Sequence, residues 1–405
     1  MLAFPLKIMK IAFDFDGICT DLSRIQNAGI DLHQYLYSPV AILFAEPRQG
    51  VLQLLSLFGL VGEIVILSAR PAVHRCEVVK WLERFGMRHL VEDIICCGDE
   101  AKVEAMDREG ISLLIEDDFA QASAARERSA AVYWERQDWS NVAMEAFGYL
   151  LANRGIPIKS ALGAVLTGVE LATDLGESHV FLFHIEEAGD LKVRVCRTER
   201  DRERLLGFLN TTERHGYCNI TQLRAVNGNA VMTTFVPGVR IGETFGEERS
   251  THLASTAAAL AALHAIPAAR TGNSVALSMH DESVSLLSCS ADNHNIIITS
   301  SGEVAFIDLG ACTLGSRWID LCWADELLCR NDQERSLLWT RYLAVSQLAP
   351  PNDEEMEFAQ RSYRVWLTEQ LIRGVEVHAG DPGKYAAIVG SIADLWSACG
   401  GSGGG

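Results

Sequence analysis

Strand-length apolar runs alternate with helical stretches through the first 150 residues of the chain. The apolar runs occupy residues 10–13, 64–67, 91–97 and 112–115, and the helical stretches 47–58, 73–85 and 102–108. In the first two of these stretches apolar side chains recur on one face of a helix, and glycines follow both. A closing strand and helix are expected within 134–149. This alternation predicts a Rossmann-like, doubly wound parallel α/β sheet.

The pattern changes at residues 153–157, where we place a linker. Beyond it, 180–185 and 191–196 alternate like antiparallel strands joined by a turn at 187–190. A charged helix at 198–208, a strand at 230–235, an alanine-rich helix at 249–265 and a hairpin of 295–298 with 304–308 follow. The remainder is expected to be helical. The predicted domains are therefore 1–152, 158–398 as an α+β domain, and a flexible glycine and serine tail at 399–405.

Composition narrows the classes of function. The net charge of −18 over 405 residues argues against a general nucleic-acid surface, which needs clustered lysine and arginine. Eleven cysteines without a C-x-x-C pair indicate reduced thiols. The opening ten residues are too short for a signal peptide, and no apolar run is long enough to cross a bilayer. We expect a cytoplasmic protein without a membrane partner.

Groups suited to phosphate chemistry stand at the ends of the predicted strands. Asp14 and Asp16 follow the first strand two residues apart, so both can face the crevice where open α/β sheets bind ligands. One carboxylate there can attack phosphorus or hold a metal while the other moves protons. Ser68, Lys102 and Asp117 follow on later elements. Each has a structural explanation when taken alone, as a helix cap, a solvated lysine or an acidic N-cap. Their joint order favours a functional site.

This order resembles the haloacid dehalogenase-like phosphatase superfamily, whose first motif here is the D-x-D-G-x-x-T-D stretch from Asp14. The resemblance implies that Asp14 is the nucleophile, Asp16 the general acid/base, Ser68 a hydrogen-bond donor to the phosphoryl group and Lys102 its counter-charge. It also implies a Mg²⁺ site at Asp14, Asp16 and Asp117, with Glu116 or Asp118 as a neighbouring candidate. The insert between Gly17 and the helix at 47–58 is short, which predicts an open site or one covered by the second domain.

The second half is similar to the aminoglycoside phosphotransferase and choline kinase group of two-lobed kinase-like folds. The resemblance rests on the sequences Phe235-Val236-Pro237-Gly238, Leu263-His264-x-x-Pro267, Asn295 before an apolar strand, Ile307-Asp308-Leu309-Gly310 and Arg317-x-x-Asp320-Leu321. It implies that Asn295 and Asp308 hold Mg²⁺ on ATP or GTP. It further implies that Arg194, or Lys192 on the same strand face, contacts the nucleotide phosphates, with Glu203 as its partner and Gly176 in the phosphate-covering turn.

One position departs from that group. Its catalytic loop places an aspartate five residues before the metal-binding asparagine, and this chain has Ser290 there. A serine cannot accept a proton as a carboxylate does. Asp292 is the possible substitute base if the loop is rearranged, whereas His280-Asp281 lies too far upstream. His264 is interpreted as a packed helix residue. The arginines between 194 and 204 alternate with acidic residues and are interpreted as a solvated face.

The sequence thus predicts a Mg²⁺-dependent phosphomonoester hydrolase fused to a kinase-like domain that phosphorylates or binds a small hydroxylated metabolite. Two alternatives stay open: a phosphatase regulated by a catalytically impaired pseudokinase module, and a nucleic-acid end phosphatase. The expected partners are a small phosphorylated substrate and a nucleotide. The sequence leaves open which substrate is used, what the oligomeric state is and whether the two domains act in one pathway.

Overall fold

The computed structural model describes residues 9–23, 31, 35, 38–135, 137–152, 158, 160–175, 178–186, 188–267, 284–289, 291–309 and 312–377. The chain divides into two compact units. The first comprises residues 1–174, 178–198 and 224–233, and the second comprises the rest.

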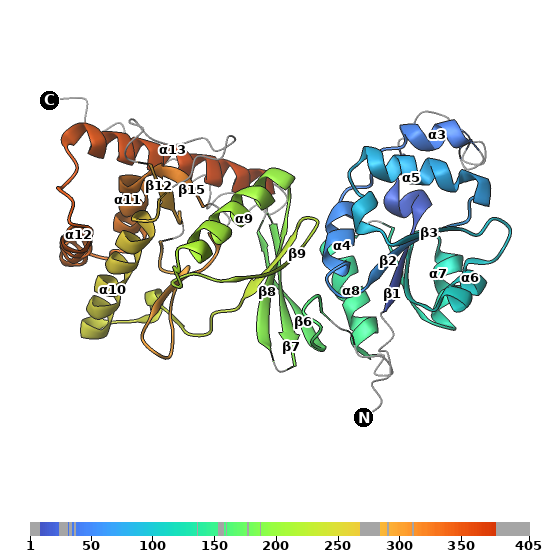
Figure 1. The fold of residues 1–405 in the computed structure, drawn as a ribbon, viewed down its shortest axis with the longest axis horizontal. Helices are drawn as coiled ribbons and strands as arrows, with labels where there is room; N and C mark the ends of the chain where they lie inside the picture. Colours follow the sequence, from blue (N-terminus) through green and yellow to red (C-terminus); the bar gives the residue numbers. More distant parts are fainter. Residues whose placement is uncertain are drawn as a thin grey trace. The chain divides into compact units, whose positions relative to one another are not determined.

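A five-stranded sheet in the order β3-β2-β1-β4-β5 forms the centre of the first unit, and its neighbouring strands are parallel (Figure 1). The strands are β1 (Lys10–Asp14), β2 (Glu63–Ser68), β3 (Asp93–Cys96), β4 (Ile111–Glu116) and β5 (Ala130–Tyr133). The central strand β1 is flanked on both sides, so it is buried along almost all its length. The predicted doubly wound parallel sheet is present.

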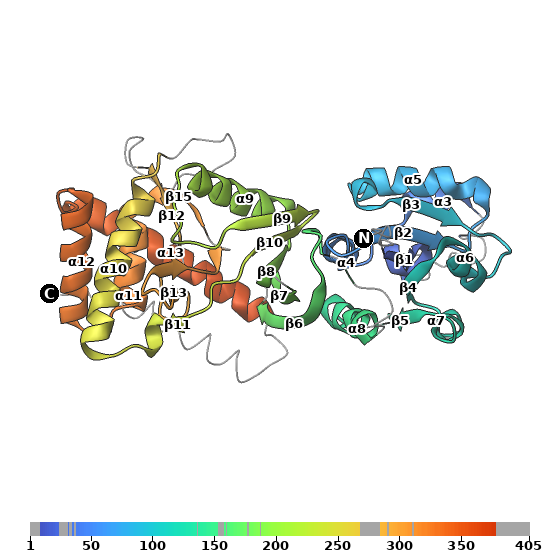
Figure 2. The same ribbon diagram turned by 60° about the horizontal axis from the view of Figure 1, so that its bottom comes forward.

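Helices cover both faces of this sheet (Figure 2). Ile11 and Phe13 of β1 pack in one core with the helices α4 (Val51–Phe58), α5 (Arg75–Arg84) and α8 (Trp139–Ala152). Ala12 points to the opposite core, formed with α6 (Lys102–Glu109) and α7 (Phe119–Arg126). This alternation is the two-residue period of a strand that is buried on both faces.

The connection after β1 is a tight π-type turn, η1 (Phe15–Cys19), in which Gly17 has φ +88°. A short helix, α3 (Pro39–Phe44), lies in the insert before α4, and 3-10 turns η2 (Ala72–His74) and η3 (Arg88–Leu90) flank α5. The left-handed backbone at Gly17 favours glycine because it lacks a Cβ.

A second five-stranded sheet, in the order β6-β7-β8-β10-β9, also belongs largely to the first unit. Its strands are β6 (Leu166–Leu175), β7 (Ser178–Ile185), β8 (Gly189–Cys196), β9 (Leu223–Asn227) and β10 (Ala230–Thr234). Phe183 of this sheet contacts Phe147 of α8 with ring centroids 5.5 Å apart, and the Asn227 side chain donates to the Ser56 carbonyl of α4 at 2.7 Å.

This packing differs from the predicted division at 152 and 158. The apolar face of β7 and β8 shares a continuous core with α4 and α8, so contacts group that sheet with the parallel sheet rather than with the helices that follow. The expected linker at 153–157 and the tail at 399–405 lie outside the described residues.

The second unit contains α9 (Glu199–Arg214), α10 (Gly246–His264) and the C-terminal helices α11 (Arg317–Leu327), α12 (Asp332–Ser346) and α13 (Asp353–Val377). Two small sheets accompany them, β11-β13-β14 and β12-β15. Their strands are β11 (Val239–Arg240), β12 (Val284–Leu287), β13 (Ile296–Ile298), β14 (Val304–Phe306) and β15 (Thr313–Ser316), and a 3-10 turn, η4 (Ile241–Glu243), follows β11.

Most predicted elements of the first 150 residues are confirmed within a few residues. The antiparallel pairing of β7 with β8 and of β13 with β14 is also confirmed. The closing strand was misplaced, because β5 ends before Trp134, and α7 was not predicted at all. Among the described helices, none has the length and apolar character needed to cross a membrane.

Candidate active site

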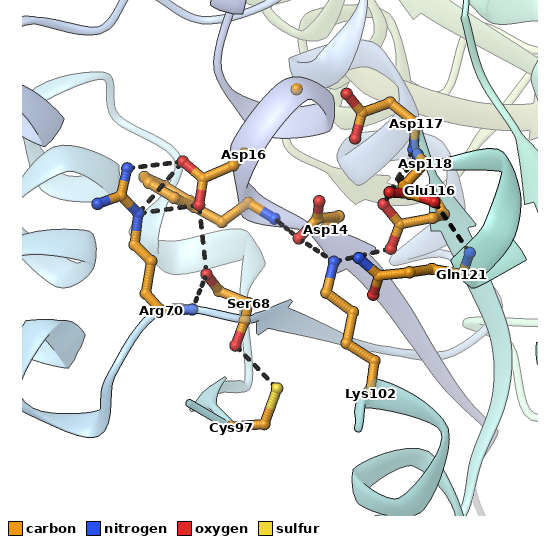
Figure 3. A network of polar contacts seen from close by, with 12 residues as sticks. Asp14, Asp16, Ser68, Arg70, Cys97, Lys102, Glu116, Asp117, Asp118 and Gln121 are labelled. Carbon is orange, nitrogen blue, oxygen red and sulfur yellow. Dashed lines mark hydrogen bonds and ion pairs between the residues drawn. The ribbon is translucent and has the colours of Figure 1, made fainter. Parts of the chain in front are cut away.

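Five predicted residues of the first unit meet at the carboxyl ends of the parallel strands (Figure 3). Asp14 ends β1, Ser68 ends β2, Lys102 opens α6, and Asp16 and Asp117 lie just beyond β1 and β4. A cavity of about 320 Å³ opens there. It is lined by Asp14, Asp16, Leu22, Ala69, Arg70, Pro71, Gly98, Lys102, Glu116, Asp117, Asp118 and Gln121. Ser68 is fully buried beneath this lining.

Lys102 bridges two buried carboxylates. Its Nζ lies 2.7 Å from Asp14 Oδ1 and 2.7 Å from Glu116 Oε2, and its side chain is 3% exposed. Burial lowers the pKa of Lys102, but the two carboxylates outweigh burial and raise it, so the lysine carries its charge. Burial raises the pKa of Asp14 and of Glu116, and Lys102 opposes both shifts. The lysine thus supplies the fixed positive charge beside Asp14.

Asp117 completes a cluster of carboxylates. Oxygen atoms of Asp14, Glu116 and Asp117 lie within 4.8 Å of one another. Burial, followed by the nearby charge of Asp14, raises the pKa of Asp117 to about 7. Gly17 faces this carboxylate so closely that a Cβ in its place would lie 1.8 Å from Asp117 Oδ2. A glycine is therefore required for Asp117 to stay in the cluster.

The cluster fits a hard divalent cation. Three carboxylates against the single ammonium of Lys102 leave an excess of two negative charges in a mostly buried site. Carboxylate oxygens are the ligands that Mg²⁺ prefers. A cation would offset the burial, and the smaller effect of neighbouring carboxylates, that raise the pKa values of Asp14 and Asp117. Asp14 and Asp117 were predicted for this site.

Asp16 was also predicted to hold the metal, and the structure places its carboxylate elsewhere. Arg70 donates hydrogen bonds to both of its oxygens, with Nη2 2.7 Å from Oδ1 and Nε 2.9 Å from Oδ2. The Ser68 hydroxyl lies 3.5 Å from Asp16 Oδ2 and accepts the backbone N–H of Arg70 at 3.2 Å. Glu116, named only as a neighbouring candidate, takes the place of Asp16 in the carboxylate cluster.

Sequence reasoning missed Arg70 entirely. The signal was its position two residues after Ser68, just beyond the end of the buried strand β2. Its backbone is also fixed, since Gly98 N–H donates to the Arg70 carbonyl at 3.0 Å. What the sequence could not indicate is which carboxylate lies opposite.

In the second unit, Asn295 and Asp308 lie at neighbouring ends of the β13–β14 hairpin. Ile296 pairs with Phe306, and the N–H of Ile307 donates to the Asn295 carbonyl at 2.8 Å. Asp308 is half-buried and has φ +57°, a conformation uncommon outside glycine. The structure therefore brings the two predicted metal ligands to the same end of one hairpin.

Asp292 caps the turn that leads to Asn295. Its Oδ1 accepts the backbone N–H groups of His294 and Asn295 at 2.8 and 2.9 Å, and its Oδ2 accepts the Asn295 amide at 2.8 Å. Its carboxylate thus orients Asn295. This geometry is that of an Asx turn rather than of an exposed base.

The other predicted nucleotide contacts are spread over both units. Arg194 and Lys192 share one face of β8, opposite to buried Val193, and Glu203 is exposed on α9. Arg194 belongs to the first compact unit and Glu203 to the second. Gly176 and Ser290 lie outside the described residues.

The interpretation of His264 as a packed residue is supported by a fully buried polar network. Its Nδ1 lies 2.7 Å from the Tyr342 hydroxyl and its Nε2 3.2 Å from Asp320 Oδ2. Asp320 also accepts the backbone N–H groups of Ser288 and Cys289, both at 2.8 Å. This network fixes the backbone that follows β12.

No protein-family model matches the chain, and none of the curated proteins matches it. Among solved structures, a macrolide 2′-phosphotransferase from Brachybacterium faecium is similar, with 14% identity over 60% of this chain and 96% of that one, at a TM-score of 0.43. A choline kinase from Cryptosporidium parvum has 10% identity over 57% of this chain and 90% of that one, at a TM-score of 0.39. A spectinomycin phosphotransferase solved with ADP and spectinomycin has 8% identity over 53% and 83%, at 0.40. At TM-scores below 0.5, these likenesses decide neither the fold nor the activity of this chain.

Proposed function

We propose that the first unit is a Mg²⁺-dependent phosphomonoester hydrolase of the haloacid dehalogenase-like kind, acting through an aspartyl-phosphate on Asp14. The observation that carries the proposal is the convergence of Asp14, Asp16, Lys102 and Asp117 on one cavity at the ends of parallel strands. Lys102, 2.7 Å from Asp14, offsets the repulsion between a carboxylate nucleophile and a phosphate dianion.

The reaction has two steps. Asp16 enters the first step in its protonated form. An Asp14 oxygen attacks phosphorus, the bond from phosphorus to the ester oxygen breaks, and the leaving oxygen takes the proton of Asp16. Water then attacks the phosphorus of the aspartyl-phosphate and gives its proton to Asp16 as the bond to Asp14 breaks, which releases inorganic phosphate and restores the carboxylate. Mg²⁺, held by Asp14 and Asp117 with Glu116, would supply positive charge to the phosphoryl oxygens.

The test is release of phosphate from an aryl phosphate in the presence of Mg²⁺. Asp14→Asn is expected to abolish it. Asp107→Asn is the matched control, because Asp107 lies on the same unit, pairs with Arg128 at the surface and is 52% exposed. Retained activity in Asp14→Asn would exclude Asp14 as the nucleophile. Including a 3′-phosphorylated oligonucleotide among the substrates tests the end-phosphatase alternative.

For the second unit we propose a kinase-like nucleotide-binding module in which Asn295 and Asp308 hold Mg²⁺ on ATP or GTP. The support is their shared position at one end of the β13–β14 hairpin. The Asp292 carboxylate, the possible substitute base, already accepts three hydrogen bonds. This favours a regulatory module over an enzyme that transfers phosphate to a small hydroxylated metabolite.

Two measurements distinguish a regulatory module from an active transferase. The first is a thermal-shift titration with Mg-ATP, and the second is a phosphotransfer screen over sugars, choline and aminoglycosides. Binding without transfer supports the regulatory module. Transfer that is lost in Asp308→Ala but kept in Asp14→Asn supports the kinase. A chain that binds no nucleotide would exclude both.

A further inference from the structure

Arg70 is a fully buried cation at the edge of the candidate active site. Its side chain has no exposed surface, and it forms a two-pronged ion pair with Asp16, whose side chain is 11% exposed. Nε contacts both Asp16 oxygens, at 3.2 and 2.9 Å, and Nη2 contacts Oδ1 at 2.7 Å. A planar guanidinium matches a carboxylate in this geometry, which fixes both the position and the rotation of the acid.

The guanidinium is itself held in place. Its centre lies 4.8 Å from the ring of Tyr35 and 5.7 Å from that of Phe15, and Nη1 lies 3.4 Å from the Tyr35 carbonyl oxygen. Both aromatic side chains are fully buried. Contacts on these sides, together with the Asp16 contact, restrict the rotamers open to Arg70. Asp16 is therefore attached to a rigid support.

The two cations of the site serve different carboxylates. Lys102 lies 2.7 Å from Asp14, whereas Arg70 is directed to Asp16, and Figure 3 shows them on opposite sides of the nucleophile. A phosphate could reach the Nε and Nη2 edge of Arg70 only by displacing Asp16. The geometry thus argues against Arg70 as a phosphate ligand.

We propose that Arg70 is a positioning residue for the reaction: it holds the Asp16 carboxylate at a fixed place beside Asp14, where Asp16 exchanges protons with the leaving group and with water. This inference rests on the proposed phosphatase function. It predicts that Arg70 contributes to the proton transfers alone, so its removal should resemble the removal of Asp16.

The dependence on the leaving group distinguishes this role from a structural one. An aryl phosphate with an acidic phenol needs little protonation in the first step, whereas an alkyl phosphate needs it in full. Arg70→Met should therefore lower kcat on an alkyl phosphate by about 10²-fold, within the usual range for general acid–base catalysis. The first turnover of nitrophenol release should change much less. KM should stay near the wild-type value, because no phosphate contact is lost.

A double-mutant cycle is the deciding experiment, with Asp16→Asn, Arg70→Met and the combined variant measured on both substrates. If Arg70 acts through Asp16, the combined variant should be no slower than Asp16→Asn alone. Arg70→Lys keeps the charge without the two-pronged contact and should be intermediate. Losses that multiply in the combined variant would overturn the inference. A first-turnover release of nitrophenol that falls as much as the alkyl-phosphate rate would also overturn it.

Folding and function are separated by two further measurements. Removing Arg70 alone leaves a mostly buried carboxylate unpaired, so melting curves accompany every variant. The combined variant replaces both charges with neutral groups and avoids that penalty, which keeps the cycle informative if Arg70→Met unfolds. A wild-type protein without Mg²⁺-dependent phosphatase activity would refute the proposed function itself, whereas an active wild type with multiplicative losses would refute only the role of Arg70.

Discussion

Replacing Gly17 by alanine should lower the affinity for Mg²⁺ while the first unit stays folded. The added Cβ would lie 1.8 Å from Asp117 Oδ2 and 2.3 Å from its Cγ, and Cβ atoms essentially never come within 3.0 Å of another atom. The Asp117 carboxylate must therefore retreat by at least 1.2 Å, the difference between 3.0 and 1.8 Å. Because it is the end of a side chain that moves, the fold can adjust, but the carboxylate leaves the cluster that it forms with Asp14 and Glu116.

The cost in folding stability and the loss of Mg²⁺ affinity can each be given a magnitude. An alanine at φ +88° costs about 1–2 kcal/mol of backbone strain. In a unit of this size, each kcal/mol lowers the melting temperature by about 2–4 °C. Changes to outer-shell partners of a metal cost about 10–100-fold in affinity, so displacing a ligand should cost at least tenfold. Tenfold corresponds to about 1.4 kcal/mol of binding free energy.

Isothermal titration with Mg²⁺, and phosphatase assays over a series of Mg²⁺ concentrations, measure the loss of affinity. Gly86→Ala is a matched control, because Gly86 also has positive φ, at +68°, but a Cβ there would meet nothing within 4 Å. It should show the strain without the loss of metal. If Gly17→Ala binds Mg²⁺ as the wild type does, Asp117 is not a ligand. An equal loss in Gly86→Ala would show that the effect is global.

Three further predictions concern the buried charges. Lys102→Met leaves Asp14 and Glu116 without their shared counter-charge. In denaturant titrations it should lower the free energy of unfolding by about 3–5 kcal/mol without metal and by less with Mg²⁺. An equal loss in both conditions would contradict this. Burial raises the pKa of Asp117 from 3.8 to about 7, so the metal-free folded unit binds that proton more tightly than the unfolded chain, and the stability it contributes below pH 4 is lost as the pH rises through 7. The melting temperature in EDTA should therefore be lower at pH 8.5 than at pH 5.5, and Asp117→Asn should reduce the difference; a wild-type melting temperature that does not fall would contradict the assignment. Asp320→Asn weakens charge-assisted hydrogen bonds from Ser288 and Cys289 and should destabilise the second unit by about 2–3 kcal/mol in denaturant titrations, so an unchanged midpoint would contradict the role of Asp320 as an anchor.

The positions of Asp14, Lys102 and Asp117 could be predicted because each follows or opens an element whose pattern is local. An apolar run with a two-residue period indicates a buried strand, and parallel strands present their carboxyl ends at one edge. Helix α7 was missed because it lacks such a local pattern. Its sequence, Phe119 to Arg126, is rich in alanine and polar residues and has little apolar periodicity, although Asp118 caps its first turn at Ala120 and Gln121.

Pairings between distant residues could not be predicted in the same way. Arg70 and Asp16 are 54 positions apart, and nothing in either local sequence selects the other. The same holds for the second sheet. The alternation of β7 predicts one apolar face, but it does not indicate that α4 and α8 cover that face. Side-chain patterns define surfaces, whereas partners follow from the topology that brings the surfaces together.

Two aspartates hold the loop that precedes Asn295. Asp320 accepts the backbone N–H groups of Ser288 and Cys289. Asp292 accepts hydrogen bonds from Asn295 at both of its carboxylate oxygens. To accept a proton from a substrate hydroxyl, Asp292 would first have to give up bonds that orient Asn295, the residue proposed to hold Mg²⁺. Phosphoryl transfer depends mostly on positioning and charge stabilisation. Gaining a base at Asp292 would therefore weaken the positioning on which transfer depends, and this conflict favours nucleotide binding without transfer.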